Sequence, residues 1–291
     1  MKILRVCSGL FVAIALLTSC ATQRINQFST FADAGKDYSD AVIVLTDQAS
    51  RAAIDADSAV LLQARKKSKE DRIQQIGDHT KSLEDLIKAM RVLREHTLLL
   101  KRYFHALGKL AGSDAPSRIG DQATNLVAAL QTINPKLKGA KFGNAPVEDF
   151  IGQAVPIVVA QFQQKALEDE LKKNGKTIER ELDLQKAALT ALTQGMVEDL
   201  KIILKLKKFA AVEKPFVFAP KLPKNWMETR QRVLSGYIAL SSAKDAAVAS
   251  KKLHSTFVAL VKNEIEPGDF DNLFADINAI ITLTELVKKT N

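Results

Sequence analysis

Cysteine and histidine are scarce in this chain of 291 residues, which limits the chemistry open to it. Its two cysteines, Cys7 and Cys20, are too few for a disulfide-dense scaffold or a multi-cysteine zinc module. The four histidines are widely spaced: His79, His96, His105 and His254. Because no two of them stand four residues apart and no HExxH sequence occurs, we expect surface or interface histidines, no metal site and no cofactor.

Sequence motifs of catalysis are also missing. No Gly-x-Ser-x-Gly sequence occurs to hold a nucleophilic serine. Gly175-Lys176-Thr177 resembles the end of a phosphate-binding loop, but position 170 is glutamate where that loop needs glycine. The carboxylates of Glu168-Asp169-Glu170 fit a solvated helical face better than a catalytic pair. The sequence therefore predicts a protein without enzyme activity.

The apolar run at the N-terminus is short. Residues 6–17 follow the positive charges of Lys2 and Arg5, and only Ser8 and Gly9 interrupt them. A run of this length cannot span the core of a bilayer, which requires about 20 residues. Together with the small residues that follow it, the run predicts a secretory signal peptide over residues 1–19.

The signal ends in Leu17, Thr18, Ser19 and Cys20, a sequence that resembles the lipobox of bacterial lipoproteins. In that family a branched apolar residue and two small residues precede an obligatory cysteine. The resemblance implies recognition of Leu17, Thr18 and Ser19 by the signal peptidase, cleavage before Cys20, and acylation of Cys20 with fatty chains such as palmitate. Several chains, at about 0.8 kcal/mol per buried methylene, make attachment to the membrane permanent. The alternatives are an ordinary signal peptide with a chance cysteine and an uncleaved anchor.

Residue Ala21 follows the cysteine. In Gram-negative lipoproteins the absence of aspartate at this position implies sorting to the outer membrane, so the resemblance implies an envelope protein on its periplasmic face. Loss of residues 1–19 removes two cations and lowers the net charge from +9 to +7. We expect residues 20–27 to form a lipidated polar tether and residues 28–291 a single elongated domain, stabilised by packing without disulfides.

Apolar residues recur at spacings of three and four through most of the chain, whereas the period of two that marks strands is almost absent. The first such patterns predict helices over residues 30–66 and 69–110. A helix of about 40 residues is about 60 Å long, which exceeds the radius of a compact globule. We therefore predict an all-α fold, an elongated bundle of five to seven long antiparallel helices.

Proline and glycine mark the expected breaks. Residues 134–146 should form an irregular loop, and a helix from residue 147 should be kinked or interrupted at Pro156 and end at Asn174-Gly175. Residues 213–225 contain three prolines and should cross the bundle as extended chain.

Small residues line two of the expected helices. One seam contains Ala49, Ala52, Ala56 and Ala59, and the other contains Ala239, Ala243 and Ala246. Because small side chains let two backbones approach closely, we expect these helices to be neighbours.

Two segments are apolar enough to serve as a contact surface for a partner. The first includes Phe150, Ile151, Ile157 and Val158, and the second includes Phe216 and Phe218 between prolines. Loops of a long bundle also need apolar anchors, so contact with the core is the interpretation that we favour for both. The alternative is an exposed patch that binds a partner protein or a membrane.

Lysine and arginine cluster where helices are expected to end: Arg65-Lys66-Lys67, Lys172-Lys173, Lys205-Lys207-Lys208 and Lys288-Lys289. Stabilisation of helix ends, under about 1 kcal/mol each, accounts for this placement. The alternative is a basic patch at each pole of the bundle for anionic lipid or a cell-wall polymer. Nucleic acid is not expected despite an isoelectric point near 9.4, because neither stacking aromatics nor a known binding module is evident.

Three classes of function stay open on the sequence. The first is a non-enzymatic, membrane-anchored envelope lipoprotein that scaffolds or binds an envelope protein partner in the periplasm. The second is a helical pore-forming or membrane-remodelling protein in which residues 150–160 insert into a bilayer. The third is a carrier of an apolar ligand, which requires an enclosed cavity between helices. We expect the first, because no residue pattern supplies a more specific chemistry.

Overall fold

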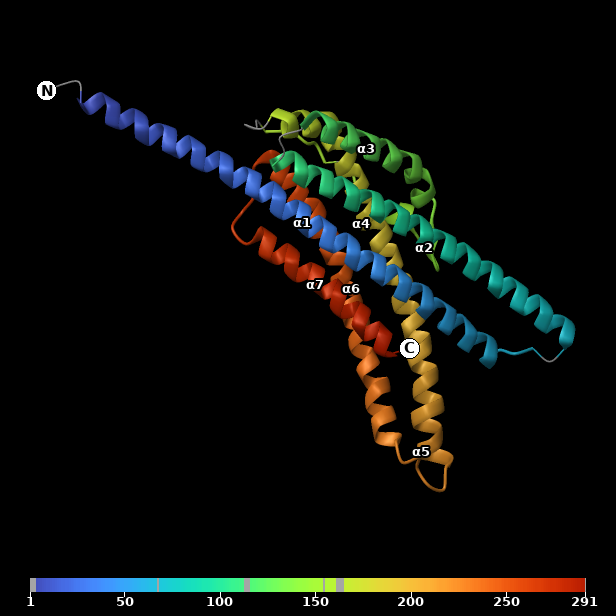
Figure 1. Cartoon of the computed structure of the whole chain (residues 1–291). Coiled ribbons are helices and arrows are strands. Elements are labelled where there is room, and N and C mark those ends of the chain that lie inside the picture. Colours follow the sequence, from blue (N-terminus) through green and yellow to red (C-terminus); the bar gives the residue numbers. More distant parts are fainter. Residues whose placement is uncertain (1–3, 67, 113–115, 154, 161–164, 291) are drawn as a thin grey trace.

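The computed structural model describes residues 4–66, 68–112, 116–153, 155–160 and 165–290 (Figure 1). Within these ranges seven α-helices account for most of the chain, and the strands amount to one small hairpin. The fold is all-α, an elongated helical bundle, as the sequence predicts. None of the helices in the described ranges is both long enough and apolar enough to cross a membrane.

Helices α1 (Leu4–Gln63) and α2 (Lys69–Gly112) form an antiparallel pair along the length of the molecule (Figure 1). Small residues bring their backbones together. A Cβ atom on Gly35 would lie 2.6 Å from the ring of Phe104. A Cβ atom on Gly108 would lie 2.9 Å from the Cβ of Ala32, so both glycines permit a close approach that a larger residue would prevent.

Helix α1 begins earlier than the expected start at residue 30. Its backbone is helical from Leu4 onward, so residues 20–27, which we expected as a polar tether, continue the helix. Phe28 is fully buried and Ile25 packs against the core. The helix extends into this segment because its buried face starts before Thr30.

The remaining long helices cover this pair. Helix α3 (Pro116–Lys138) packs against α2 and α4 (Lys165–Lys207), and α7 (Asp269–Thr290) packs against α1 and α6 (Trp226–Lys262). Helices α4 and α6 run antiparallel and diverge from the α1–α2 pair, so that their far ends stand away from the rest of the bundle (Figure 1).

Aromatic rings fix the point where α1, α2 and α6 meet. The ring centroid of Phe31 lies 5.6 Å from that of Phe104 and 5.7 Å from that of Phe257. Helices α1 and α6 are therefore neighbours, as the sequence predicts. The alanines expected on the α6 side of this contact, at positions 239, 243 and 246, lie outside the side chains that the structure describes.

The expected loop over residues 134–146 is wrong. Helix α3 continues to Lys138, and a hairpin of β1 (Lys141–Phe142) and β2 (Ala145–Pro146) follows it. The two-residue turn between the strands contains Gly143, whose φ of 61° favours glycine. Phe142 is buried, which gives this short hairpin an anchor in the core.

The expected helix over residues 147–173 is wrong in its first part, and among the described residues it forms only from Lys165. Only η1 (Val147–Phe150), a 3₁₀ turn, forms at its start, and residues 151–153 and 155–160 have no regular structure. Helix α4 then continues through Asn174-Gly175 without a break. It continues because Asn174 is buried and its Nδ2 donates a hydrogen bond to Oε1 of Glu170, 2.9 Å away, one turn earlier in the helix.

The far ends of α4 and α6 are joined by helix rather than by the expected extended chain. A π-helix, η2 (Lys208–Glu213), leads directly into the short helix α5 (Lys214–Phe218). Pro215 lacks a backbone N–H and cannot donate the regular α-helical hydrogen bond, so an irregularity next to it is expected. Residues 219–225 then turn the chain into α6.

Candidate functional site

The lipobox residues Leu17, Thr18, Ser19 and Cys20 lie on the N-terminal part of α1. Their backbone is helical, and their side chains are outside those that the structure describes. This end of α1 projects beyond the other helices, at the opposite end of the molecule from α5 (Figure 1).

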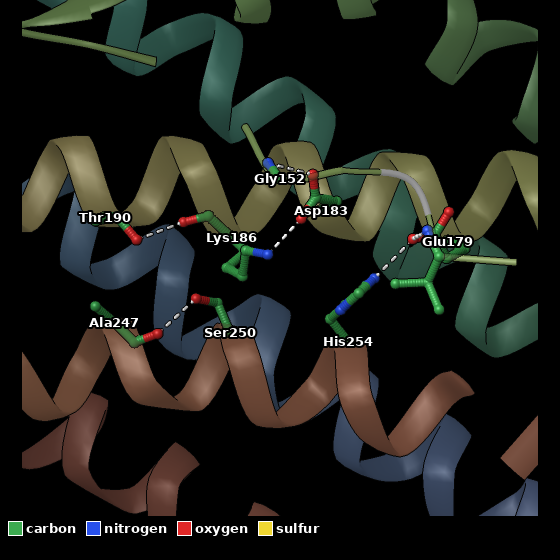
Figure 2. A network of polar contacts seen from close by, with 9 residues as sticks. Gly152, Glu179, Asp183, Lys186, Thr190, Ala247, Ser250 and His254 are labelled. Carbon is green, nitrogen blue, oxygen red and sulfur yellow. Dashed lines mark hydrogen bonds and ion pairs between the residues drawn. The ribbon is translucent and has the colours of Figure 1, made fainter. Parts of the chain in front are cut away.

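The first predicted contact segment is held against the bundle. We call residues 151–160 the strap. Three backbone N–H groups fix it. Gly152 donates to Oδ2 of Asp183 at 2.9 Å (Figure 2). Val155 donates to Oε1 of Glu179 at 3.2 Å, and Ala160 donates to the carbonyl of Val261 at 3.1 Å. The strap thus bridges α4 and α6.

Side chains of the strap divide between core and solvent. Phe150, just before it, packs against the core, and so do Ile151 and Ile157, whereas Val158 is 76% exposed. These four residues therefore do not form one exposed patch. The arrangement fits the anchoring interpretation for the first three.

The side chains that hold the strap belong to a buried polar layer along α4. Four carboxylates of this helix are at most 5% exposed: Glu170, Glu179, Glu181 and Asp183. Glu179 contacts Nε2 of His254 on α6 at 3.0 Å, and Asp183 forms an ion pair with Lys186 (Figure 2). The sequence suggested a solvated face for Glu170, whereas the structure buries this side chain.

A second group in this layer joins α4 to α2 and α3. His96 is fully buried, with Nδ1 2.7 Å from Oε1 of Gln185 and Nε2 3.0 Å from Oε2 of Glu181. Asn134 donates to the other oxygen of Glu181 at 2.9 Å. Nε2 of Gln185 donates to Oγ1 of Thr97 at 2.9 Å, which leaves its Oε1 as the acceptor for His96. His96 therefore connects Gln185 and Glu181 through its two ring nitrogens.

Burial shifts the acidity of a third pair in the layer. Desolvation raises the pKa of Glu170, although the hydrogen bond from Asn174 opposes the change. Burial, and then the charge of Glu170, raise the pKa of Tyr103 well above its usual range. Both shifts favour the protonated forms, which a buried interface accommodates at lower cost than charges.

The polar layer connects elements, and it borders one small groove of about 260 Å³ whose lining includes Asn134, Glu179 and Asp183. Each of its histidine–carboxylate contacts is made between two packed helices, with both partners at most about a tenth exposed. Among the described residues no group of three or more histidines, cysteines and carboxylates is placed to hold a metal ion. The contacts of the layer therefore orient α2, α3, α4 and α6 relative to one another.

Other grooves lie outside this layer. One of about 690 Å³ lies between α1, α2 and α4, with Asp57, Asp199 and Lys136 among its lining residues. Burial, then Glu198 and Asp57, raise the pKa of Asp199 to about 6.

A second groove, of about 610 Å³, lies between α2 and α3, with an apolar floor that includes Leu98 and Leu126 and a rim that includes His105. Partial burial, then Lys109 and Lys36, lower the pKa of His105. Both grooves are open to solvent, and neither is the enclosed cavity that a carrier of apolar ligands requires.

The second predicted contact segment is at the free end of the α4–α6 pair. We call residues 205–232 the distal tip. Its exposed apolar side chains are Phe209, Phe216, Val217, Phe218, Leu222 and Met227. Phe216 is 63% exposed and Phe218 is 73% exposed, and no residue of α5 is buried. The anchoring interpretation is therefore wrong for these two phenylalanines.

The distal tip has a defined conformation. The rings of Phe216 and Trp226 stack with centroids 5.4 Å apart, and the indole N–H of Trp226 donates to the carbonyl of Val212 at 3.0 Å. Backbone hydrogen bonds also close both turns, from Ala219 to Pro215 and from Trp226 to Pro223, each at 3.0 Å. The contacts of Trp226 with Phe216 and Val212 thus stabilise the conformation in which the apolar side chains of the tip are exposed.

Positive charge is concentrated in the distal tip. Residues 205–232 include eight lysines and arginines and only two glutamates. One of these glutamates, Glu213, forms an ion pair with Lys208 at 3.0 Å and raises the pKa of that lysine. The tip therefore combines exposed aromatic residues with a net positive charge, a combination typical of surfaces that bind anionic partners.

Sequence patterns found part of this surface. The aromatic run at Phe216 and Phe218 and the basic cluster at Lys205 were both identified, but as separate features. The structure brings them together because α4, η2 and α6 meet at one end of the bundle. Phe209 and Met227 were missed, since each lies in a helical stretch where an apolar residue is expected to face a core.

Comparison with known proteins adds no relative. No protein-family model, no curated protein and no solved structure matches the chain significantly. The residues themselves must therefore support any functional conclusion.

Proposed function

We propose that this chain is a lipoprotein of the cell envelope, without enzyme activity, that holds a contact surface away from its membrane anchor. In this proposal Cys20 carries the lipid and anchors the protein in the outer membrane, on the periplasmic face. The distal tip contacts another envelope component, either an envelope protein or an anionic lipid or polymer. The elongated bundle acts as the spacer between the two ends.

The observation that carries this proposal is the exposed apolar surface of the distal tip. An isolated cluster of exposed phenylalanines costs solubility unless it has a partner, and folded proteins seldom keep one without a binding role. The tip is also held in shape by the contact between Phe216 and Trp226. A preformed surface needs less ordering on binding, which favours recognition.

A pore-forming or membrane-remodelling role through residues 150–160 receives less support. Insertion of the strap into a bilayer would break the hydrogen bonds that Gly152, Val155 and Ala160 make to α4 and α6. It would also leave Glu179 and Asp183 buried without these donors, which costs about 1–3 kcal/mol for each unsatisfied group.

Photo-crosslinking in producing cells tests the proposal. A photoreactive residue at Phe218 should form an adduct with an envelope component, whereas one at Leu62, which is 79% exposed and outside the tip, should not. The Cys20→Ala variant should carry no acyl group when its mass is measured by mass spectrometry, and it should no longer be found in the membrane fraction. Unchanged fractionation of Cys20→Ala, or equal adducts at the two positions, would contradict the proposal.

A further inference from the structure

No residue of helix α5 is buried, and Phe216 packs against Trp226 on its inner side. Residues 215–220 are without charge, and Val217 and Phe218 extend from this stretch into solvent. Lys214 and Lys221 stand at its two ends, so a short apolar centre is enclosed by cations. This is the order of side chains found where protein meets the boundary between acyl chains and headgroups.

The kind of cation distinguishes lipid from protein as the occupant. Six of the eight cations in residues 205–232 are lysines. Interfaces between proteins are depleted of lysine, whereas lysine clusters near a membrane surface are attracted by anionic headgroups. The charge and the aromatic centre of the tip together fit a phospholipid surface better than an acidic protein.

The tip is remote from the anchored end of the chain. Helix α6 meets α1 where Phe257 contacts Phe31, close to the N-terminal end of the packed part of α1. From Phe257 to Trp226 is 31 residues of α6, or about 46 Å at 1.5 Å per residue. Figure 1 places the N-terminal end of α1 and α5 at opposite ends of the molecule. The tip therefore faces a surface other than the leaflet that would hold Cys20.

We infer that the distal tip docks on a phospholipid surface with anionic headgroups, separate from the membrane that holds the Cys20 anchor. Val217, Phe218 and Met227 enter the boundary between headgroups and acyl chains, and the surrounding lysines bind the headgroups. The bundle thereby links two membrane surfaces. This inference rests on the proposed function, because it names the envelope component that the tip contacts.

Vesicle flotation tests this inference on the mature chain, residues 20–291, with Cys20→Ala so that no acyl group binds lipid. This chain retains the whole described core, which starts at Ile25 and Phe28. It should float with vesicles of phosphatidylcholine and phosphatidylglycerol, and not with phosphatidylcholine alone. High salt should weaken the binding, since screening removes the attraction of the lysines.

Trp226 is the one tryptophan of the chain and lies in the tip, so its fluorescence reports docking without a label. Its emission should move to shorter wavelength with the anionic vesicles and stay unchanged with the neutral ones. Emission that is unchanged by vesicles which nevertheless float the protein would place the contact elsewhere and overturn the inference.

Apolar variants locate the contact. Val217→Ser combined with Phe218→Ser should weaken partitioning about tenfold or more for each side chain, because neither side chain is then transferred from water. The matched control is Leu62→Ser combined with Ile73→Ser, since both residues are exposed outside the tip. This control should bind as the parent chain does.

Charge variants distinguish an effect of the lysines in the tip from an effect of the net charge of the whole chain. Lys221→Glu combined with Lys224→Glu should weaken binding by at least about fivefold for each lysine. Lys66→Glu combined with Lys81→Glu makes the same change of net charge outside the tip and should leave binding unchanged. Equal losses in the two pairs would overturn the inference.

Failure of the inference and failure of the proposed function give different results. If the chain does not bind anionic vesicles but Phe218 still crosslinks to an acidic envelope protein in cells, the lipid inference is wrong and the proposed function stands. If vesicles bind at the tip but Phe218 forms no adduct in cells and Cys20→Ala fractionates unchanged, the proposed function is wrong.

Discussion

Glu179 and Glu181, two buried carboxylates of α4, have different neighbours. These different contacts fix the register of the helices that pack against α4. Glu181 faces His96 and Asn134, and Glu179 faces His254 and the strap. Apolar seams alone allow helices to slide by one turn, whereas these polar contacts are satisfied in one register only. The cost of leaving one of them unsatisfied is what gives the layer its specificity.

Removal of His96 should therefore be strongly destabilising. His96→Leu leaves Glu181 buried without its histidine partner, and we expect a loss of about 3–5 kcal/mol in the free energy of unfolding. His79→Leu is the matched control, because its partner Asp57 is partly exposed and an exposed pair contributes about 1 kcal/mol or less. Denaturant unfolding measures both. Equal losses would contradict a special role for the buried pair.

Asp199 should make stability depend on pH. Burial raises its pKa from the ordinary 3.8 to about 6, so between these values the folded state binds the proton more tightly than the unfolded state. Stability from this group is thus greatest at acid pH and is lost as the pH rises through 6. Asp199→Asn should increase stability at pH 7 by on the order of 1–3 kcal/mol, and by much less at pH 4.

Unfolding by denaturant at both pH values checks this expectation. Asp55→Asn, on an exposed position of α1, is the control and should leave the pH dependence as it is in the parent chain. If Asp199→Asn increased the free energy of unfolding equally at both pH values, the raised pKa of Asp199 would be contradicted.

At the scale of helices, close approach of α1 and α2 depends on glycine. Gly35→Ala places a methyl group against the ring of Phe104 and should destabilise the protein by about 1–3 kcal/mol through overpacking. Gly77→Ala on α2 meets no atom within 4 Å and should stabilise the helix by about 0.5–1 kcal/mol. Melting curves that move in the same direction for both would contradict the close approach.

How far the sequence predicts these elements depends on whether their signal is local. The period of three and four gives the all-α class and the long helices, because an amphipathic helix repeats its apolar face along its own length. The continuation of α4 through Asn174-Gly175 is not local. An Asn-Gly pair is typical of a helix end, whereas here the side chain of Asn174 is buried and bonded to Glu170, and that burial depends on neighbouring helices.

The strap and the hairpin show the same limit. The pattern around Pro156 predicts a kinked or interrupted helix, yet the strap is stabilised by carboxylates more than 20 residues later in the sequence. The hairpin before it depends on burial of Phe142 against α4, where a Cβ atom on Gly195 would lie 2.7 Å from the carbonyl oxygen of Phe142. Neither contact has a signature within its own segment.

At the scale of the whole molecule, two ends with different chemistry follow from the arrangement of the helices. The apolar and basic residues of the distal tip could be read from the sequence, but their exposure could not. Exposure follows from the divergence of α4 and α6 from the α1–α2 pair, which leaves the tip without a neighbour among the described elements. In the proposed function, the bundle is a spacer with the lipid of Cys20 at one end and the apolar, basic surface of the distal tip at the other.

Bridging of two vesicle populations tests this account most directly. The lipidated chain is placed in phosphatidylcholine donor vesicles, and acceptor vesicles containing phosphatidylglycerol are added, with joining measured by fluorescence cross-correlation. The parent chain should join donor to acceptor vesicles. The variant that combines Val217→Ser with Phe218→Ser should not join them. Joining that is unaffected by this pair of changes, or no joining by the lipidated parent chain, would contradict the account.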